Sequence, residues 1–171
     1  MKVNRRRILL TLLVVSIIVW FILLGLEKYR SEKAENYSRI EDGLYMGGLV
    51  QKPPRRAKAV LNLCEIEDPY RCEVHWWEPI PDREPAPDLD WLRRMVEFVD
   101  AQRHAGRTVY VHCVAGISRS GMVVVAYLMF RNKWTRDEAL AFVRTKRDVV
   151  RPNPAFMDRL SEWEKVCQAQ R

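Results

Sequence analysis

The sequence of 171 residues predicts an α/β domain with a central, mostly parallel sheet flanked by helices and preceded by one transmembrane helix. Three observations lead to this prediction. From Ile40 onward, short apolar runs alternate with longer stretches of helical periodicity, which is typical of strands joined by helices. Residues 8–26 (ILLTLLVVSIIVWFILLGL) form one uncharged apolar run. Finally, residues 110–121 (YVHCVAGISRSG) join a strand-like run to a long, apolar, helix-like run.

The N-terminal apolar run predicts a membrane anchor. As a helix, its nineteen residues would extend about 28 Å, close to the hydrocarbon thickness of roughly 30 Å. No A-x-A cleavage site follows, so we expect an uncleaved single-pass anchor and a membrane localisation. Residues 1–7 then form a basic N-terminal segment and residues 27–39 a juxtamembrane linker. Basic residues flank the run on both sides, so the side of the membrane stays open.

Four strands are predicted in the domain, which we place at residues 40–169. Each is a short run rich in apolar, β-branched or aromatic residues, at 44–48, 58–64, 74–80 and 108–113. Residues 81–88 (PDREPAPD) contain three prolines, so they are expected to form a loop rather than a regular element.

Four helices are predicted from periodicity and capping residues. Asp88 is a natural N-cap for an amphipathic helix over 89–105, and Thr135 and Glu138 have the spacing of a capping box for a helix within 134–147. The apolar run after Gly121 predicts a buried helix over about 120–131. Pro154 opens the last helix, which extends to about residue 169.

Composition and charge exclude several classes of protein. The net charge is +7, with 48% hydrophobic and 30% charged residues. Lys2 and Arg5–Arg7 supply four of the positive charges, and the remaining 25 basic residues exceed the 22 acidic ones by only three. No long basic run with interleaved aromatic residues occurs, so no nucleic-acid partner is expected. The four cysteines form no CxxC pair and no zinc-ligand spacing, so no metal site is predicted.

Cys113 lies at the junction between a predicted strand and the predicted helix that follows it. A helix N-terminus binds anions and stabilises a thiolate, which is the reactive form of cysteine. The loop that follows has room to turn its N–H groups inward as an anion nest, and the small Ala115 and Gly116 let the backbone approach an anion closely. Arg119, six residues after Cys113, is expected to point into the same loop.

The pattern His-Cys-x5-Arg-Ser at residues 112–120 resembles the signature of the cysteine-dependent protein tyrosine phosphatases. The longer HCVAGISRSG and the following AYLM resemble the dual-specificity branch in particular. Four further segments stand in the order that this family shows them, so the resemblance covers roughly residues 40–165: LYMGG, VLNLC, the WTRDEAL helix and RPNPAFMDRL.

The resemblance implies a covalent mechanism in which Cys113 is the nucleophile and Arg119 holds two phosphate oxygens. Ser120 is expected to donate to the Cys113 sulfur, and His112 to order the loop by hydrogen bonding. Because the loop and Arg119 supply the electrostatics, no cofactor is implied. The implied phosphate-binding residues are Val114, Ala115, Gly116, Ile117, Ser118 and Arg119.

The resemblance also implies an aspartate about thirty residues before the cysteine, acting as a general acid and then a base. Asp82 lies 31 residues before Cys113, in the proline-rich loop, and is our candidate. A solvated loop charge is the alternative for Asp82. Asp88 is better explained as a helix cap, and Asp90 as an acid in the first helical turn.

The predicted function is hydrolysis of phosphate monoesters on phosphotyrosine and phosphoserine/threonine proteins. The alternative is a membrane phospholipid phosphatase of the phosphatidylglycerophosphate type with the same mechanism. Val114 and Ile117 are apolar where phosphatases of polyphosphorylated inositol lipids often carry lysines. A silent phosphate-binding module is disfavoured because the cysteine, arginine and acid are all present. A redox enzyme is disfavoured because no resolving cysteine closely follows Cys113.

Cys64 ends the predicted strand 58–64, as Cys113 ends another. If the two strands are parallel neighbours, both sulfurs lie at one sheet edge, where a reversible disulfide would protect the nucleophile from over-oxidation. A buried core thiol is the favoured alternative for Cys64.

Overall fold

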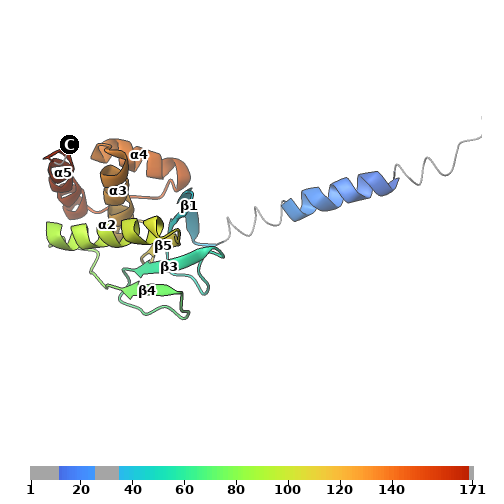
Figure 1. The fold of residues 1–171 in the computed structure, drawn as a ribbon, viewed down its shortest axis with the longest axis horizontal. Coiled ribbons are helices and arrows are strands. Elements are labelled where there is room, and N and C mark those ends of the chain that lie inside the picture. Colours follow the sequence, from blue (N-terminus) through green and yellow to red (C-terminus); the bar gives the residue numbers. More distant parts are fainter. Residues whose placement is uncertain (1–11, 26–34, 170–171) are drawn as a thin grey trace, which may run out of the picture. The chain divides into compact units, whose positions relative to one another are not determined.

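The computed structural model describes residues 12–25 and 35–169 of the chain (Figure 1). The N-terminal residues up to 35 and the residues from 36 onward form separate units. The predicted basic segment 1–7, both ends of the predicted anchor and residues 27–34 of the predicted linker lie outside the described residues.

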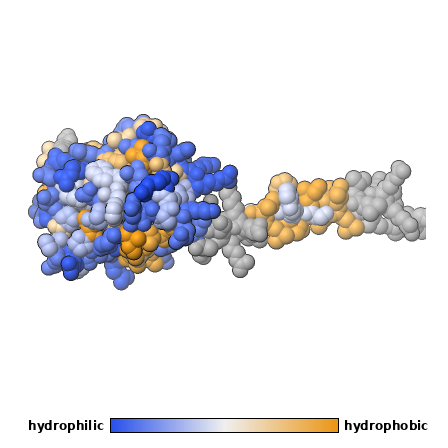
Figure 2. Space-filling model, turned by 90° about the horizontal axis from the view of Figure 1, so that it is seen from below, coloured by the Kyte–Doolittle hydropathy of each residue, from blue (hydrophilic) through white to orange (hydrophobic). Residues whose placement is uncertain are grey.

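The N-terminal unit corrects the predicted membrane anchor. Its helix, described over residues 12–25, is mostly apolar on the face that Figure 2 shows. Among the described residues, no helix combines the length and the apolar character that crossing a membrane requires. The prediction of a single-pass membrane protein anchored through residues 8–26 is therefore wrong.

A five-stranded mixed sheet forms the centre of the second unit. Its spatial order is β1-β2-β5-β3-β4, and only β1 and β2 pair antiparallel. The remaining neighbours pair in parallel. The strands are β1 (Tyr37–Glu41), β2 (Leu44–Gly47), β3 (Ala57–Asn62), β4 (Val74–Trp77) and β5 (Thr108–His112).

Strand β1 was not predicted, since residues 37–39 fall in the segment expected to be a linker. Tyr37 gives this edge strand an apolar contact on the sheet, because its ring packs edge to face against Tyr45 and Tyr110 at centroid distances of 5.8 and 5.9 Å.

Three of the four helices described in this unit begin at the predicted capping signals. Asp88 accepts a hydrogen bond from Trp91 N at 2.7 Å, and Thr135 and Glu138 form the expected capping box. The last helix begins at Pro154. The helices are α2 (Leu89–His104), α3 (Arg119–Asn132), α4 (Arg136–Lys146) and α5 (Pro154–Ala169).

These helices gather on one face of the sheet (Figure 1), where they bury the main core. Helix α3 is apolar nearly all round because it packs against α2, α4 and α5 as well as the sheet. Strand β5 alternates between the two faces. Val109 and Val111 enter the main core, whereas Tyr110 joins a smaller cluster with Ala57 and Val60.

Candidate active site

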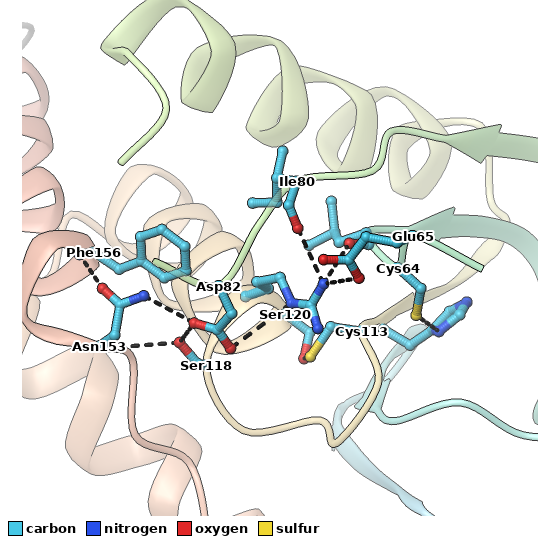
Figure 3. A network of polar contacts seen from close by, with 12 residues as sticks. Cys64, Glu65, Ile80, Asp82, Cys113, Ser118, Ser120, Asn153 and Phe156 are labelled. Carbon is cyan, nitrogen blue, oxygen red and sulfur yellow. Dashed lines mark hydrogen bonds and ion pairs between the residues drawn. The ribbon is translucent and has the colours of Figure 1, made fainter. Parts of the chain in front are cut away.

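The predicted site residues gather where the parallel strands β3 and β5 end. Cys113 directly follows β5, and the loop of residues 114–118 leads from it into the N-terminus of α3. Strand β3 is the parallel neighbour of β5, so the residues after Asn62 reach the same edge. Figure 3 shows Cys113 and Ser118 together with residues from two other segments, Cys64 and Glu65 after β3 and Ile80 and Asp82 after β4, converging there. The fold therefore assembles the site from segments far apart in sequence.

The loop after Cys113 turns its carbonyl groups outward. Arg147 donates to two of them, from Nη2 to Ala115 O at 3.0 Å and from Nε to Gly116 O at 2.7 Å. Backbone N–H groups take three others: Leu49 N donates to Val114 O, Arg151 N to Ile117 O and Met122 N to Ser118 O. Because the C=O and N–H of a peptide unit point in opposite directions, the N–H groups of residues 115–119 face the inside of the loop. This arrangement is a nest suited to an anion.

The two apolar loop residues lie on the rim of the nest. Val114 and Ile117 are 42% and 36% exposed, so their side chains project toward solvent rather than into the core.

Cys113 lies at the base of the nest and is 1% exposed. Its Sγ is 3.3 Å from Ser120 Oγ, as expected from the sequence, and the same hydroxyl is 3.3 Å from the carbonyl of Gly47. Ser118 is the N-cap of α3 but makes no side-chain cap. The N-terminal end of α3 is thus directed at the nest, and its dipole favours negative charge there.

Arg119 closes the site from the side of β3. Its Nη1 donates to the carbonyls of Leu63 (3.3 Å) and Ile80 (3.0 Å) and to Glu65 Oε2 (2.6 Å). Burial alone would lower the pKa of Arg119, but the hydrogen bond that Arg119 donates to Glu65 and the charge of Cys113 raise it overall. The same bond lowers the pKa of Glu65. The guanidinium is therefore both charged and fixed in orientation.

Asp82, our candidate acid, contacts the end of the loop. Its Oδ1 accepts hydrogen bonds from Ser118 Oγ at 2.6 Å and from Asn153 Nδ2 at 2.8 Å, and its Oδ2 is 3.8 Å from Arg119 Nε. The rival acids lie elsewhere, since Asp88 caps α2 and Asp90 is in the first turn of that helix. Of the three candidate aspartates, Asp82 is thus the one that contacts the loop.

His112 supports the loop from behind. It is fully buried at the end of β5, with Nε2 3.0 Å from Asp68 Oδ2 and Nδ1 3.7 Å from Cys64 Sγ. These contacts fix the ring at the base of the loop. Across the part of the chain that the structure describes, no group of three or more His, Cys, Asp or Glu side chains is placed to hold a metal ion.

Cys64 is a free, fully buried thiol at the same sheet edge as Cys113. Burial, followed by the neighbouring charge of Cys113, raises the pKa of Cys64 to about 12. Its thiolate is therefore strongly disfavoured in this state of the protein.

Four residues of this region were missed in the sequence: Glu65, Asp68, Arg147 and Asn153. Asn153 carried one available signal, because Asn directly before Pro154 is a typical helix N-cap. That signal indicates a cap, which Asn153 provides, but not the contact with Asp82. Glu65, Asp68 and Arg147 carry charges that the sequence alone does not distinguish from surface charges.

Comparison with known proteins agrees with this geometry. A family profile described as "Dual specificity phosphatase, catalytic domain" matches residues 56–166. Dual specificity protein phosphatase 1 from Homo sapiens is 41% identical over 91 residues, which are 53% of this chain and 25% of that protein. Dual specificity protein phosphatase 4 from Homo sapiens is 37% identical over 114 residues, covering 65% and 29% of the two chains. This chain thus spans only about a quarter of the length of these relatives.

Among solved structures, the crystal structure of PTPMT1 in complex with PI(5)P is similar to this fold. It has a TM-score of 0.70 and 27% sequence identity, and the match covers 80% of this chain and 99% of that one. The family profile covers well over half of the sequence and includes the whole loop from Cys113 to Arg119. The chain therefore belongs to the dual-specificity phosphatase catalytic domain family.

Proposed function

We propose that this protein hydrolyses phosphate monoesters on phosphotyrosine and phosphoserine/threonine proteins through a cysteinyl-phosphate intermediate. The observation that carries this proposal is the outward turn of the five carbonyls of residues 114–118, which leaves a ring of N–H groups around Cys113. Family membership and the dual-specificity phosphatase relatives support the same activity.

In the first step, the Cys113 thiolate attacks phosphorus and forms a P–S bond while the bond from phosphorus to the ester oxygen breaks. Protonated Asp82 transfers its proton to the departing oxygen. The loop N–H groups and Arg119 hold the three non-bridging oxygens, whose charge they stabilise as the transition state forms. The end of α3 stabilises the thiolate before attack, because the helix N-terminus carries partial positive charge.

In the second step, Asp82 takes a proton from water as the water oxygen attacks phosphorus. The P–S bond breaks, and the sulfur leaves as the thiolate. Ser120, 3.3 Å from Cys113 Sγ, donates to that leaving sulfur. His112 acts through geometry only, because Asp68 and Cys64 hold its ring at the base of the loop.

A second candidate is a phospholipid phosphatase of the phosphatidylglycerophosphate type with the same mechanism. It is favoured by the similarity to PTPMT1, whose structure is a complex with PI(5)P. The exposed, apolar side chains of Val114 and Ile117 at the rim are also compatible with a lipid substrate.

The test is phosphate release by the full chain, with chelator present, from a phosphotyrosine peptide, a phosphothreonine peptide and phosphatidylglycerol phosphate vesicles. We expect turnover of both peptides and none with Cys113→Ser. Preferential turnover of the vesicles would support the lipid candidate instead. Absence of turnover on all three substrates, or activity that survives in Cys113→Ser, would contradict the proposed mechanism.

A further inference from the structure

Asn153 joins three parts of the site. It lies directly before α5, its backbone N donates to Ser118 Oγ at 3.1 Å, and its Nδ2 donates to Asp82 Oδ1 at 2.8 Å. Its Oδ1 accepts a hydrogen bond from Phe156 N at 2.9 Å, which caps α5. Figure 3 shows the Asn153 side chain between Phe156 and Asp82. One side chain therefore connects the proline-rich loop to a helix end.

The cap fixes which way the Asn153 amide faces. A backbone N–H is only a donor, so the side-chain oxygen must face Phe156 N, and the NH2 group must then face Asp82. The orientation is set by the helix rather than by the acid. Asn153 therefore presents a donor to Asp82 in either protonation state of that carboxyl group.

This donor determines which oxygen of the Asp82 carboxyl group carries the proton. Its Oδ1 already accepts from two groups, Ser118 Oγ and Asn153 Nδ2. The other oxygen, Oδ2, is 3.8 Å from Arg119 Nε, beyond hydrogen-bond length. Because Asn153 Nδ2 is only a donor, it favours Oδ1 as the unprotonated, accepting oxygen of the carboxyl group, and the proton is therefore assigned to Oδ2 on the side of Arg119.

We propose that Asn153 is a positioning residue that holds Asp82 so that Oδ2 carries the proton to the leaving group. This inference rests on the proposed function, since it requires Asp82 to act as general acid. The Asp82 side chain is 35% exposed and lies in a loop that forms no helix or strand. Without Asn153 Nδ2, only the Ser118 hydroxyl holds the carboxyl group, and the acid loses its fixed direction.

The main variant is Asn153→Ser, because serine is as good an N-cap as asparagine but has no amide to reach Asp82. The backbone bond from residue 153 to Ser118 remains. The measurement is kcat/KM of the full chain on phenyl phosphate, a poor leaving group, and on p-nitrophenyl phosphate, a good one. General acid catalysis is worth about 10²–10⁴-fold, so we expect a loss of about tenfold on phenyl phosphate and less than about threefold on p-nitrophenyl phosphate.

Asn153→Asp is the second variant. It also keeps the helix cap but places a carboxylate against Asp82 Oδ1, so its loss on phenyl phosphate should exceed that of Asn153→Ser. Thermal unfolding of both variants checks that α5 is intact. Equal losses on the two substrates, with unchanged unfolding, would overturn the inference.

A double-mutant cycle separates this inference from the proposed function. Asp82→Asn alone should cause the larger loss on phenyl phosphate, and adding Asn153→Ser to it should cause no further loss. If Asn153→Ser costs the same factor in both backgrounds, Asn153 does not act through Asp82 and the inference fails. If Asp82→Asn itself leaves the dependence on the leaving group unchanged, the acid assignment fails, and the inference fails with it.

Discussion

Arg119 must be held in a fixed orientation and must also keep hydrogen-bond donors available for a ligand. Its Nη1 is fully engaged by Glu65 and by the carbonyls of Leu63 and Ile80, while its buried Nε has no hydrogen-bond partner among the described residues. An unsatisfied buried donor is costly in a folded protein. The contacts of Nη1 fix the orientation of the guanidinium, and its other N–H donors remain available for the oxygens of a bound phosphate. Glu65 is therefore expected to act on catalysis through Arg119.

Glu65→Gln keeps the shape of the side chain but removes the charge that holds Arg119. We expect kcat/KM on a phosphotyrosine peptide to fall about tenfold, less than the ~100- to 1000-fold cost of removing a transition-state donor outright. The pKa of Glu65 is lowered in the folded protein, so its carboxylate stays charged at every pH above that lowered pKa. The charge is lost only when the pH falls below the range in which an ordinary glutamate takes up a proton. The ratio of wild-type to variant kcat/KM should therefore be constant from about pH 6 to pH 8. A ratio that changes across this range would show that another group controls Arg119.

How far the site can be predicted from the sequence depends on how local each residue's role is. Cys113 and Arg119 share one loop, so their spacing alone indicates that they meet. Asp82 was proposed because its distance along the chain and its proline-rich loop fit the resemblance. Glu65 and Asn153 escaped prediction because their partners lie 54 and 71 residues away, and only the folded sheet brings them together.

At the scale of elements, the end of β2 and the loop after Cys113 approach so closely that only glycine fits. A Cβ on Gly116 would lie 2.3 Å from the carbonyl carbon of Gly47 and 2.6 Å from Gly48 N, and Gly116 has a φ of +69°. A Cβ on Gly48 would lie 2.6 Å from the carbonyl oxygen of Val114. The two glycines at the end of β2 and directly after it, Gly47 and Gly48, thus support the loop.

Gly116→Ala should destabilise the domain by about 2–3 kcal/mol, because a strained φ is added to contact with backbone atoms that cannot move aside. Gly106→Ala is the matched control. Gly106 has a φ of +73° but nothing within 4 Å of its Cβ position, so its cost should be only the left-handed strain of about 1 kcal/mol. Urea unfolding measures both, and kcat/KM should fall only for Gly116→Ala. Equal destabilisation by the two variants would show that backbone contact plays no part.

The elements themselves were predicted to different degrees. Helices α2 and α4 carry their own capping signals, Asp88 and Thr135, so sequence located their starts. Strand β1 has no such local signal, since it is an edge strand whose order comes from pairing with β2 and from aromatic contacts of Tyr37. Pairing between strands is a tertiary property that residues 37–39 do not reveal by themselves.

At the scale of the whole molecule, the error at the N-terminus and the success in the domain have one cause. An apolar run reveals that its residues avoid water, but not which structure removes them from water, and no helix among the described residues is long and apolar enough to cross a membrane. In the domain, by contrast, apolar runs alternate with turns and caps that delimit each element. The periodic apolar runs, together with the turn and cap residues between them, predicted the α/β architecture. At the N-terminus, where hydropathy was the only signal, the prediction was wrong.

A buried polar cluster beneath the sheet edge links the stability of the whole domain to pH. Oδ2 of buried Asp68 lies 3.0 Å from His112 Nε2 and 3.1 Å from His75 Nε2, joining β4 to β5 behind the nest. Burial lowers the pKa of His75, an effect that nearby Arg71 and His112 reinforce and that Asp68 opposes. Above the unfolded-state pKa of about 6.5, His75 is neutral in both states and contributes no pH dependence.

Below that pKa the unfolded chain takes up a proton that the folded state resists, so stability is lost as pH falls from about 6.5 toward the lowered pKa of His75. We therefore expect the Tm to fall between pH 7 and pH 5, and this slope to flatten in His75→Gln. His104→Gln, on the exposed surface of α2, is the matched control and should keep the wild-type slope. If His75→Gln retains the full slope, or if the wild-type Tm rises on acidification, the buried histidine does not govern the acid sensitivity of the fold.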